Sequence, residues 1–137
     1  MANLQGGCLC GKVRYTISAD PVFSGVCHCT SCQKGSGSAF SVVVAVPSSG
    51  VAVTGTLTTY TGKGDSGQDT TRRFCSNCGS PIIAEAAMMP GVTMIEVGTL
   101  DDPSAVSLQM HIYCRSKMSW VQIPEGVGKF ETMPTGP

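Results

Sequence analysis

The stretch Cys8-Leu-Cys-Gly-Lys-Val-Arg-Tyr-Thr-Ile17 joins a cysteine pair directly to a run in which polar and apolar side chains alternate. From Lys12 onward every second side chain is apolar, which is the period-two pattern of a half-buried strand. Gly11 tolerates a positive φ, so the backbone amides around it can turn towards the cysteine sulfurs, as is typical of zinc knuckles. The stretch therefore predicts a strand that begins at a metal-binding turn.

Short runs of β-forming residues separated by turn-forming residues continue along the chain. These runs are Ala39 to Val46, Leu57 to Tyr60, Arg72 to Cys75, Pro81 to Ala84, Val92 to Leu100 and His111 to Cys114. The best helical candidate is a turn or two that begins near Thr30, a suitable N-cap, and stops at Gly35. We therefore predict a mainly β fold, a small antiparallel β-sandwich or barrel-like domain with at most short helical turns.

The length of the chain fits one hydrophobic core. A single core usually forms at roughly 100 to 150 residues, and the chain has 137 residues, so we expect one domain over residues 1–137. Residues 124–137 have little apolar content and are expected to form a loosely attached tail. Tyr15 and Trp120 are expected in the core or at its edge.

Charge and hydropathy argue against two classes of partner. Nine Lys and Arg balance nine Asp and Glu without any run of like charge, so the basic patch needed to bind nucleic acid is missing. No run approaches the roughly 18 apolar residues of a membrane span, and the first 12 residues lack the pattern of a signal peptide. We expect a cytoplasmic protein without nucleic-acid or membrane partners.

Seven of the eight cysteines fall into three tight groups. They are Cys8 and Cys10, then Cys27, Cys29 and Cys32, then Cys75 and Cys78, whereas Cys114 stands alone and is interpreted as a buried free thiol. Two cysteines one or two residues apart bridge each other only with strain, but they readily present two sulfurs to one ion at about 2.3 Å. Clustering therefore favours metal over disulfides.

Ligand counting divides these groups between two zinc sites. A structural zinc takes four protein ligands, whereas a catalytic zinc keeps three and leaves one position open. We predict a structural zinc on Cys8, Cys10, Cys75 and Cys78, with a disulfide or an iron–sulfur cluster as alternatives. We predict a second zinc with an open position on Cys27, Cys29 and Cys32. Two alternatives remain there: a structural zinc completed by His28, His111 or Cys114, and a metal-free redox cluster.

Three motifs resemble one known family. Gly6-Gly-Cys-Leu-Cys-Gly-Lys-Val-Arg-Tyr15, Cys27-His-Cys-Thr-Ser-Cys-Gln33 and Arg73-Phe-Cys-Ser-Asn-Cys-Gly-Ser80 are similar to those of the glutathione-dependent formaldehyde-activating enzymes, a family that includes centromere protein V. The resemblance runs from about Gly6 to Trp120. It implies the same division of the cysteines, with catalytic zinc on Cys27, Cys29 and Cys32.

The resemblance also implies a reaction. The family adds glutathione to formaldehyde to give S-hydroxymethylglutathione, a carbon–sulfur lyase reaction, so the implied partners are a thiol such as glutathione and a small aldehyde. Because three thiolates weaken the Lewis acidity of the ion, capture of the thiol is favoured over polarisation of the carbonyl. Arg72 and Arg73 are candidates to pair with glutathione carboxylates, or they face solvent. The alternative function is a non-catalytic module in which both metals are structural.

Overall fold

A computed structural model describes residues 3–134, in which short strands form two β sheets and one short α helix lies between strands. The strands are β1 (Leu4–Gly7), β2 (Arg14–Ile17), β3 (Phe23–Cys27), β4 (Ser41–Pro47), β5 (Val51–Thr54), β6 (Leu57–Lys63), β7 (Asp69–Cys75), β8 (Pro81–Ala86), β9 (Val92–Glu96), β10 (Met110–Ile112) and β11 (Gly128–Lys129). The α helix is α1 (Thr30–Ser36), and single 3₁₀ turns span Ser48–Gly50, Val97–Thr99, Pro103–Ala105 and Cys114–Ser116. The predicted mainly β fold is confirmed.

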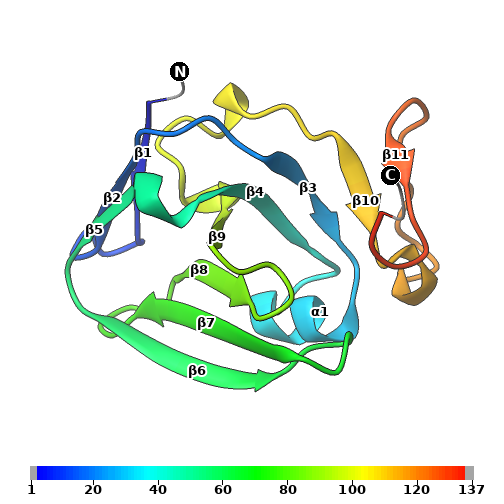
Figure 1. Cartoon of the computed structure of the whole chain (residues 1–137), viewed down its shortest axis with the longest axis horizontal. Coiled ribbons are helices and arrows are strands. Elements are labelled where there is room, and N and C mark those ends of the chain that lie inside the picture. Colours follow the sequence, from blue (N-terminus) through cyan, green and yellow to red (C-terminus); the bar gives the residue numbers. More distant parts are fainter. Residues whose placement is uncertain (1–2, 135–137) are drawn as a thin grey trace.

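The two sheets enclose the interior from different sides. The smaller sheet has the order β1-β2-β5, and the larger has the order β11-β10-β3-β4-β9-β8-β7-β6. Figure 1 shows the larger sheet curling from β3 and β4 at the top through β9 to β6 at the bottom, with the smaller sheet standing at the left. This curvature gives the sandwich or barrel-like shape that the repeated short strands predicted.

The core lies between these sheets and follows the predicted alternation. In β2, Tyr15 and Ile17 are buried while Arg14 and Thr16 are exposed. The core cluster consists of Cys8, Val13, Tyr15, Ile17, Val44, Val46, Cys75, Ile82, Ile83, Ile95, Val97 and Leu100. Burial of each large aliphatic side chain contributes about 1.5–3 kcal/mol, so this cluster stabilises the contact between the sheets.

One edge of the larger sheet departs from the antiparallel pattern. Strand β10 pairs in parallel with β3 on one side, with Met110 opposite Gly25, and in parallel with β11 on the other. The His111 to Cys114 run was expected to be a strand, but β10 ends at Ile112. The cause is Tyr113, whose φ of 55° turns the backbone out of the extended conformation.

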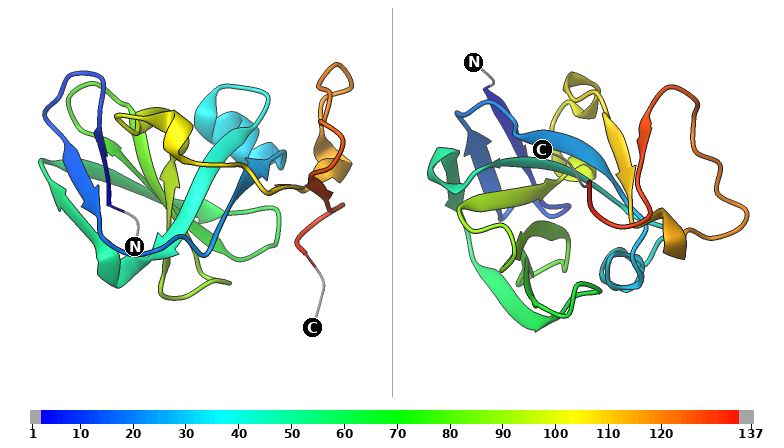
Figure 2. Two further views of the ribbon diagram at one scale, coloured as in Figure 1. Left: turned by 90° about the horizontal axis from the view of Figure 1, so that it is seen from above. Right: turned by 45° about the vertical axis from the view of Figure 1, so that its right-hand side comes forward.

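The C-terminal segment is attached more firmly than we expected from its composition. Backbone amides of Tyr113 and Cys114 donate to the carbonyls of Thr132 and Phe130 at 2.9 and 3.0 Å. Figure 2 shows this segment, coloured orange to red, at the side of the molecule beyond β10. Main-chain pairing, which needs no apolar side chains, therefore holds residues 128–132; residues 135–137 lie outside the described range.

Trp120 corrects a second expectation. Tyr15 is 2% exposed, as expected for a core residue, whereas Trp120 is 71% exposed. Trp120 lies in the loop between β10 and β11, where no strand turns alternate residues inward. The sequence around it gives no periodic pattern, so its aromatic character alone led to the wrong assignment.

Candidate metal centres

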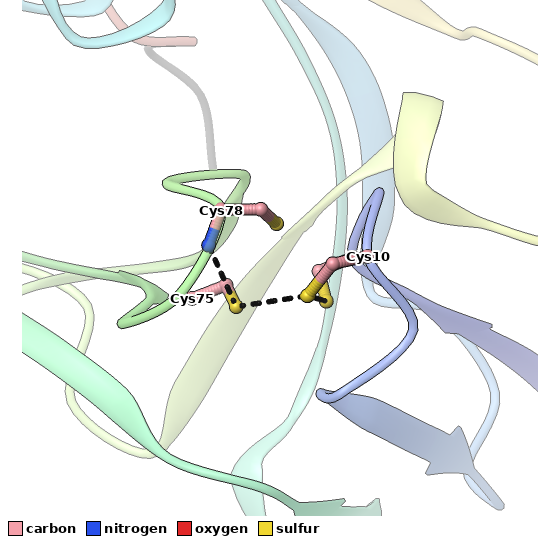
Figure 3. A group of neighbouring side chains, drawn as sticks. Cys10, Cys75 and Cys78 are labelled. Atoms are coloured by element: carbon pink, nitrogen blue, oxygen red, sulfur yellow. Dashed lines mark hydrogen bonds between the residues drawn. The ribbon is translucent and has the colours of Figure 1, made fainter.

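The four cysteines of the first and last groups meet between the two sheets. Cys8 and Cys10 lie in the β1–β2 loop, while Cys75 ends β7 and Cys78 follows in the turn to β8. Their four sulfurs all lie within 4.8 Å of one another. Figure 3 shows Cys10 facing Cys75 and Cys78 across the gap between the two loops.

The spacing of these sulfurs fits a tetrahedral ion. The Cys8 and Cys10 sulfurs are 3.5 Å apart, and the Cys10 and Cys75 sulfurs are 3.8 Å apart. Four sulfurs at 2.3 Å from a tetrahedral zinc would be separated by about 3.8 Å. The cluster can therefore hold a metal ion without rearrangement of its loops.

The turn after β7 directs amides and a hydroxyl at the sulfurs. The Cys75 sulfur accepts from the backbone amides of Asn77 and Cys78 at 3.3 and 3.4 Å. Gly79, with φ of 79°, closes this turn, and its amide donates to the Cys75 carbonyl. The Ser80 hydroxyl lies 3.2 Å from the Cys78 sulfur, and hydrogen bonds from Ser80 lower the pKa of Cys78 to about 5. Such donors stabilise thiolates, the form that binds metal.

The three-cysteine group forms at the junction of β3 and α1. Cys27 ends β3, and Cys29 and Cys32 lie at the start of the helix, with all three sulfurs within 4.8 Å of one another. Cys29, rather than Thr30, is the N-cap, and its sulfur accepts from the Cys32 amide at 3.2 Å. Among residues 3–134, no fourth Cys, His, Asp or Glu joins this cluster.

The three residues considered as a fourth ligand do not join this cluster. His28 is fully buried, and its Nε2 lies 2.8 Å from His111 Nδ1. Cys114 is half-buried rather than buried, and its sulfur lies 3.5 Å from the His111 carbonyl oxygen. The geometry therefore lends no support to a closed second site built from these side chains.

Charge within the three-cysteine group concentrates on one sulfur. Hydrogen bonds from Cys27 and Cys29, together with the nearby Arg72 guanidinium, lower the pKa of Cys32. The hydrogen bonds with Cys29 and Cys32, followed by burial, raise the pKa of Cys27. Without a metal, the cluster therefore favours one thiolate stabilised by two thiols, and an ion would be needed to hold three thiolates together.

Arg72 and Arg73, adjacent in β7, have different surroundings. Arg72 Nη2 lies 2.9 Å from Ser31 Oγ and 3.9 Å from the Cys32 sulfur, at the wall of a cavity beside the three cysteines. Arg73 instead pairs with Glu85 at 2.8 Å. Alternation in β7 thus directs only Arg72 to the three-cysteine site.

Glu96 is a cavity residue that the sequence reasoning missed. It ends β9 and lines the same cavity as Cys32 and Arg72. Burial, and secondarily the charge of Cys32, raises the pKa of Glu96 to about 7. A carboxylate at the end of the otherwise uncharged strand Val92–Glu96 was the available signal, since β9 is central in the larger sheet.

Comparison with known proteins assigns this chain to a family. The sequence profile of the family described as "Glutathione-dependent formaldehyde-activating enzyme" matches residues 3–116. This chain belongs to that family. This chain is 40% identical over 57 residues to a protein of Emericella nidulans. That protein is provisionally named a glutathione-dependent formaldehyde-activating enzyme. That alignment spans 38% of this chain and only 29% of the relative.

A solved structure shares the fold of this family member. The crystal structure of a Rhodobacter sphaeroides protein, a structural genomics target, matches it with a TM-score of 0.59 at 20% identity. The match covers 76% of this chain and 96% of that protein. Within residues 3–134, no helix has the length and hydropathy needed to cross a membrane.

Proposed function

We propose that this protein is a zinc-dependent carbon–sulfur lyase that adds glutathione, or a similar thiol, to formaldehyde or another small electrophile. Zinc bound by Cys27, Cys29 and Cys32 would be catalytic, and zinc bound by Cys8, Cys10, Cys75 and Cys78 would be structural. We also propose that residues 1–137 form a single domain and that the protein is cytoplasmic, where a reducing environment would keep these thiols free.

The observation that carries this proposal is the three-sulfur cluster in the wall of a cavity, without a fourth protein ligand among residues 3–134. Three protein ligands and an open position characterise catalytic zinc, whereas four characterise structural zinc. One cluster offers three sulfurs and the other four, which supports a catalytic role for the first and a structural role for the second. Family membership supplies the thiol and the aldehyde.

The proposed reaction needs one bond to form and one proton to move. The thiol sulfur bonds to the carbonyl carbon, the π electrons of the carbonyl pass to its oxygen, and the thiol proton ends on that oxygen. Zinc, when bound, supplies a position where a thiol is held as its thiolate near neutral pH. Cys27, Cys29 and Cys32 fix that position, because two of them belong to the first turn of α1.

Two cavity residues would serve the substrates. The Arg72 guanidinium, 3.9 Å from the Cys32 sulfur, favours negative charge on a thiolate that enters beside it and can orient a carboxylate of a peptide thiol. The Glu96 carboxyl, whose pKa is raised to about 7, can hold the proton that passes from sulfur to oxygen. Arg72 would thus bind and orient the thiol, and Glu96 would carry the proton.

The test combines metal analysis with a rate measurement. Purified protein should contain about two zinc ions per chain, and glutathione should speed formaldehyde consumption above the uncatalysed rate. Cys29→Ser should lose this acceleration and one zinc, while α1 remains because serine is a favoured N-cap. Cys114→Ser is the matched control, since Cys114 lies outside both clusters.

The competing function is a non-catalytic zinc module. It predicts that added thiol leaves the coordination of the second zinc unchanged and that Cys29→Ser alters no rate. A single zinc per freshly loaded chain, with Cys27, Cys29 and Cys32 freely alkylated, would refute the open site.

A further inference from the structure

The cavity beside the three cysteines has an apolar wall that a reaction with formaldehyde does not require. Four methionines, Met88, Met89, Met94 and Met133, line it together with small side chains that include Ala84 and Ala86. They come from β8, the β8–β9 turn, β9 and the C-terminal segment. These regions, far apart in sequence, converge on the reaction site.

The cavity is also larger than formaldehyde needs. The centre of a water-sized sphere can move through about 80 Å³ of it, whereas a site that holds only one water leaves that centre almost no room to move. Formaldehyde has two non-hydrogen atoms and is only slightly larger than water. Space therefore remains beyond formaldehyde, and the thiol that enters beside Arg72 can share it with an alkyl group of the aldehyde.

The chemistry of the lining points to an alkyl group. Hydrated formaldehyde carries two hydroxyls, which methionine side chains satisfy poorly because a thioether is only a weak acceptor. Methionine adapts its shape to apolar ligands of different length. The polar groups of the cavity, Arg72 and Glu96 among them, line it together with the cysteines, so a polar reacting end and an apolar chain can both be accommodated.

Resting on the function proposed above, we propose that the electrophile is a short-chain aliphatic aldehyde whose alkyl group packs against the methionines, in preference to formaldehyde. The reaction is the same addition: the thiol sulfur bonds to the aldehyde carbon and the thiol proton passes to the oxygen, which gives a hemithioacetal. No oxidant or reductant is consumed. Each methylene buried in the cavity should raise kcat/KM about fourfold, equivalent to ~0.8 kcal/mol.

The first test compares aldehydes on the zinc-loaded protein with glutathione. Exchange NMR at the aldehyde carbon should show the catalysed acceleration, which is kcat/KM divided by the uncatalysed rate constant of the same aldehyde, rising from formaldehyde through propanal to pentanal. Ala86→Leu, which fills part of the cavity, should lower the ratio of pentanal to formaldehyde at least tenfold. Ala52→Leu is the matched control, because Ala52 is exposed in β5 and does not line the cavity.

The second test reads binding without turnover. Pentan-1-ol, an unreactive analogue, should shift the ¹³C-methyl NMR signals of the four lining methionines. The signals of Met110 and Met118, which do not line the cavity, should stay unchanged. If formaldehyde is accelerated and pentanal is not, or if Ala86→Leu leaves the ratio unchanged, this inference alone is overturned. If no aldehyde is accelerated, the proposed function fails and the substrate preference with it.

Discussion

Cys10→Ser should separate the contribution of the four-cysteine site from that of the core. Cys75 is 1% exposed and part of the core, so replacing it would also disturb packing, whereas Cys10 is exposed. Loss of one ligand would weaken the binding of an ion that, when bound, ties the β1–β2 loop to the end of β7. The effect on stability should therefore come from loss of the cross-link.

The size of the effect follows from the length of chain that the metal closes. Cys10 and Cys75 are 65 positions apart with their sulfurs at 3.8 Å. Treating the metal as a cross-link over a loop of that length gives about 4 kcal/mol of lost unfolded-state entropy. In a domain of this size, that loss corresponds to a fall in Tm of roughly 10–20 °C.

Urea unfolding of zinc-loaded protein, followed by circular dichroism with zinc counted in parallel, measures this difference. Cys114→Ser is the control, and it should keep its zinc and nearly all its stability. Chelation of both proteins should bring the native chain and the Cys10→Ser variant to nearly the same stability, because both then lack metal at either site. The reasoning is refuted if Cys10→Ser loses its zinc yet unfolds at the same urea concentration as the Cys114→Ser control.

Three further predictions follow from single side chains. Burial raises the pKa of Glu96 from 4.5 to about 7, so its ionisation destabilises the folded state as pH rises. Glu96→Gln removes this effect. Between pH 5.5 and 8.5, its free energy of unfolding in urea should therefore rise by ~2 kcal/mol relative to that of the native chain. Arg72→Gln should raise the pKa of the Cys32 thiol, because it removes the neighbouring positive charge. The pH dependence of iodoacetamide alkylation of metal-free protein should therefore shift to higher pH, whereas Arg73→Gln should cause no shift. Ile95→Ala, at a fully buried position, should cost about 2–5 kcal/mol by thermal unfolding, against less than about 0.5 for exposed Val22→Ala.

The strands that could be predicted from the sequence are those whose pattern of apolar and polar side chains matches the buried and exposed positions of the strand. Alternation in β2 and the β-branched run of β4 mark the buried positions directly, because one face of each strand meets the core. Strand β1 contains two glycines, and β3 contains one. Such segments become strands through pairing with distant partners, which local composition does not encode.

The cysteine groups could be predicted because ligand spacing is a local property. Sequence separations of two and three residues place sulfurs near one ion whatever the rest of the chain does. The cavity could not be predicted in the same way. Glu96 and Met133 approach the cysteines only after the larger sheet curls, so their role depends on tertiary structure rather than on a motif.

The parallel pairing of β10 with β3 sets an order for assembly during translation. The four-cysteine cluster needs nothing beyond Cys78, so it can bind its ion while the remaining chain is still being synthesised. The cavity beside the three cysteines must wait for β10 and for Met133, contacts of long sequence separation that form slowly. A nascent chain that has released Cys78 from the ribosome but not yet β10 would therefore be able to form the four-cysteine site while its other three clustered thiols are uncovered and open to oxidation.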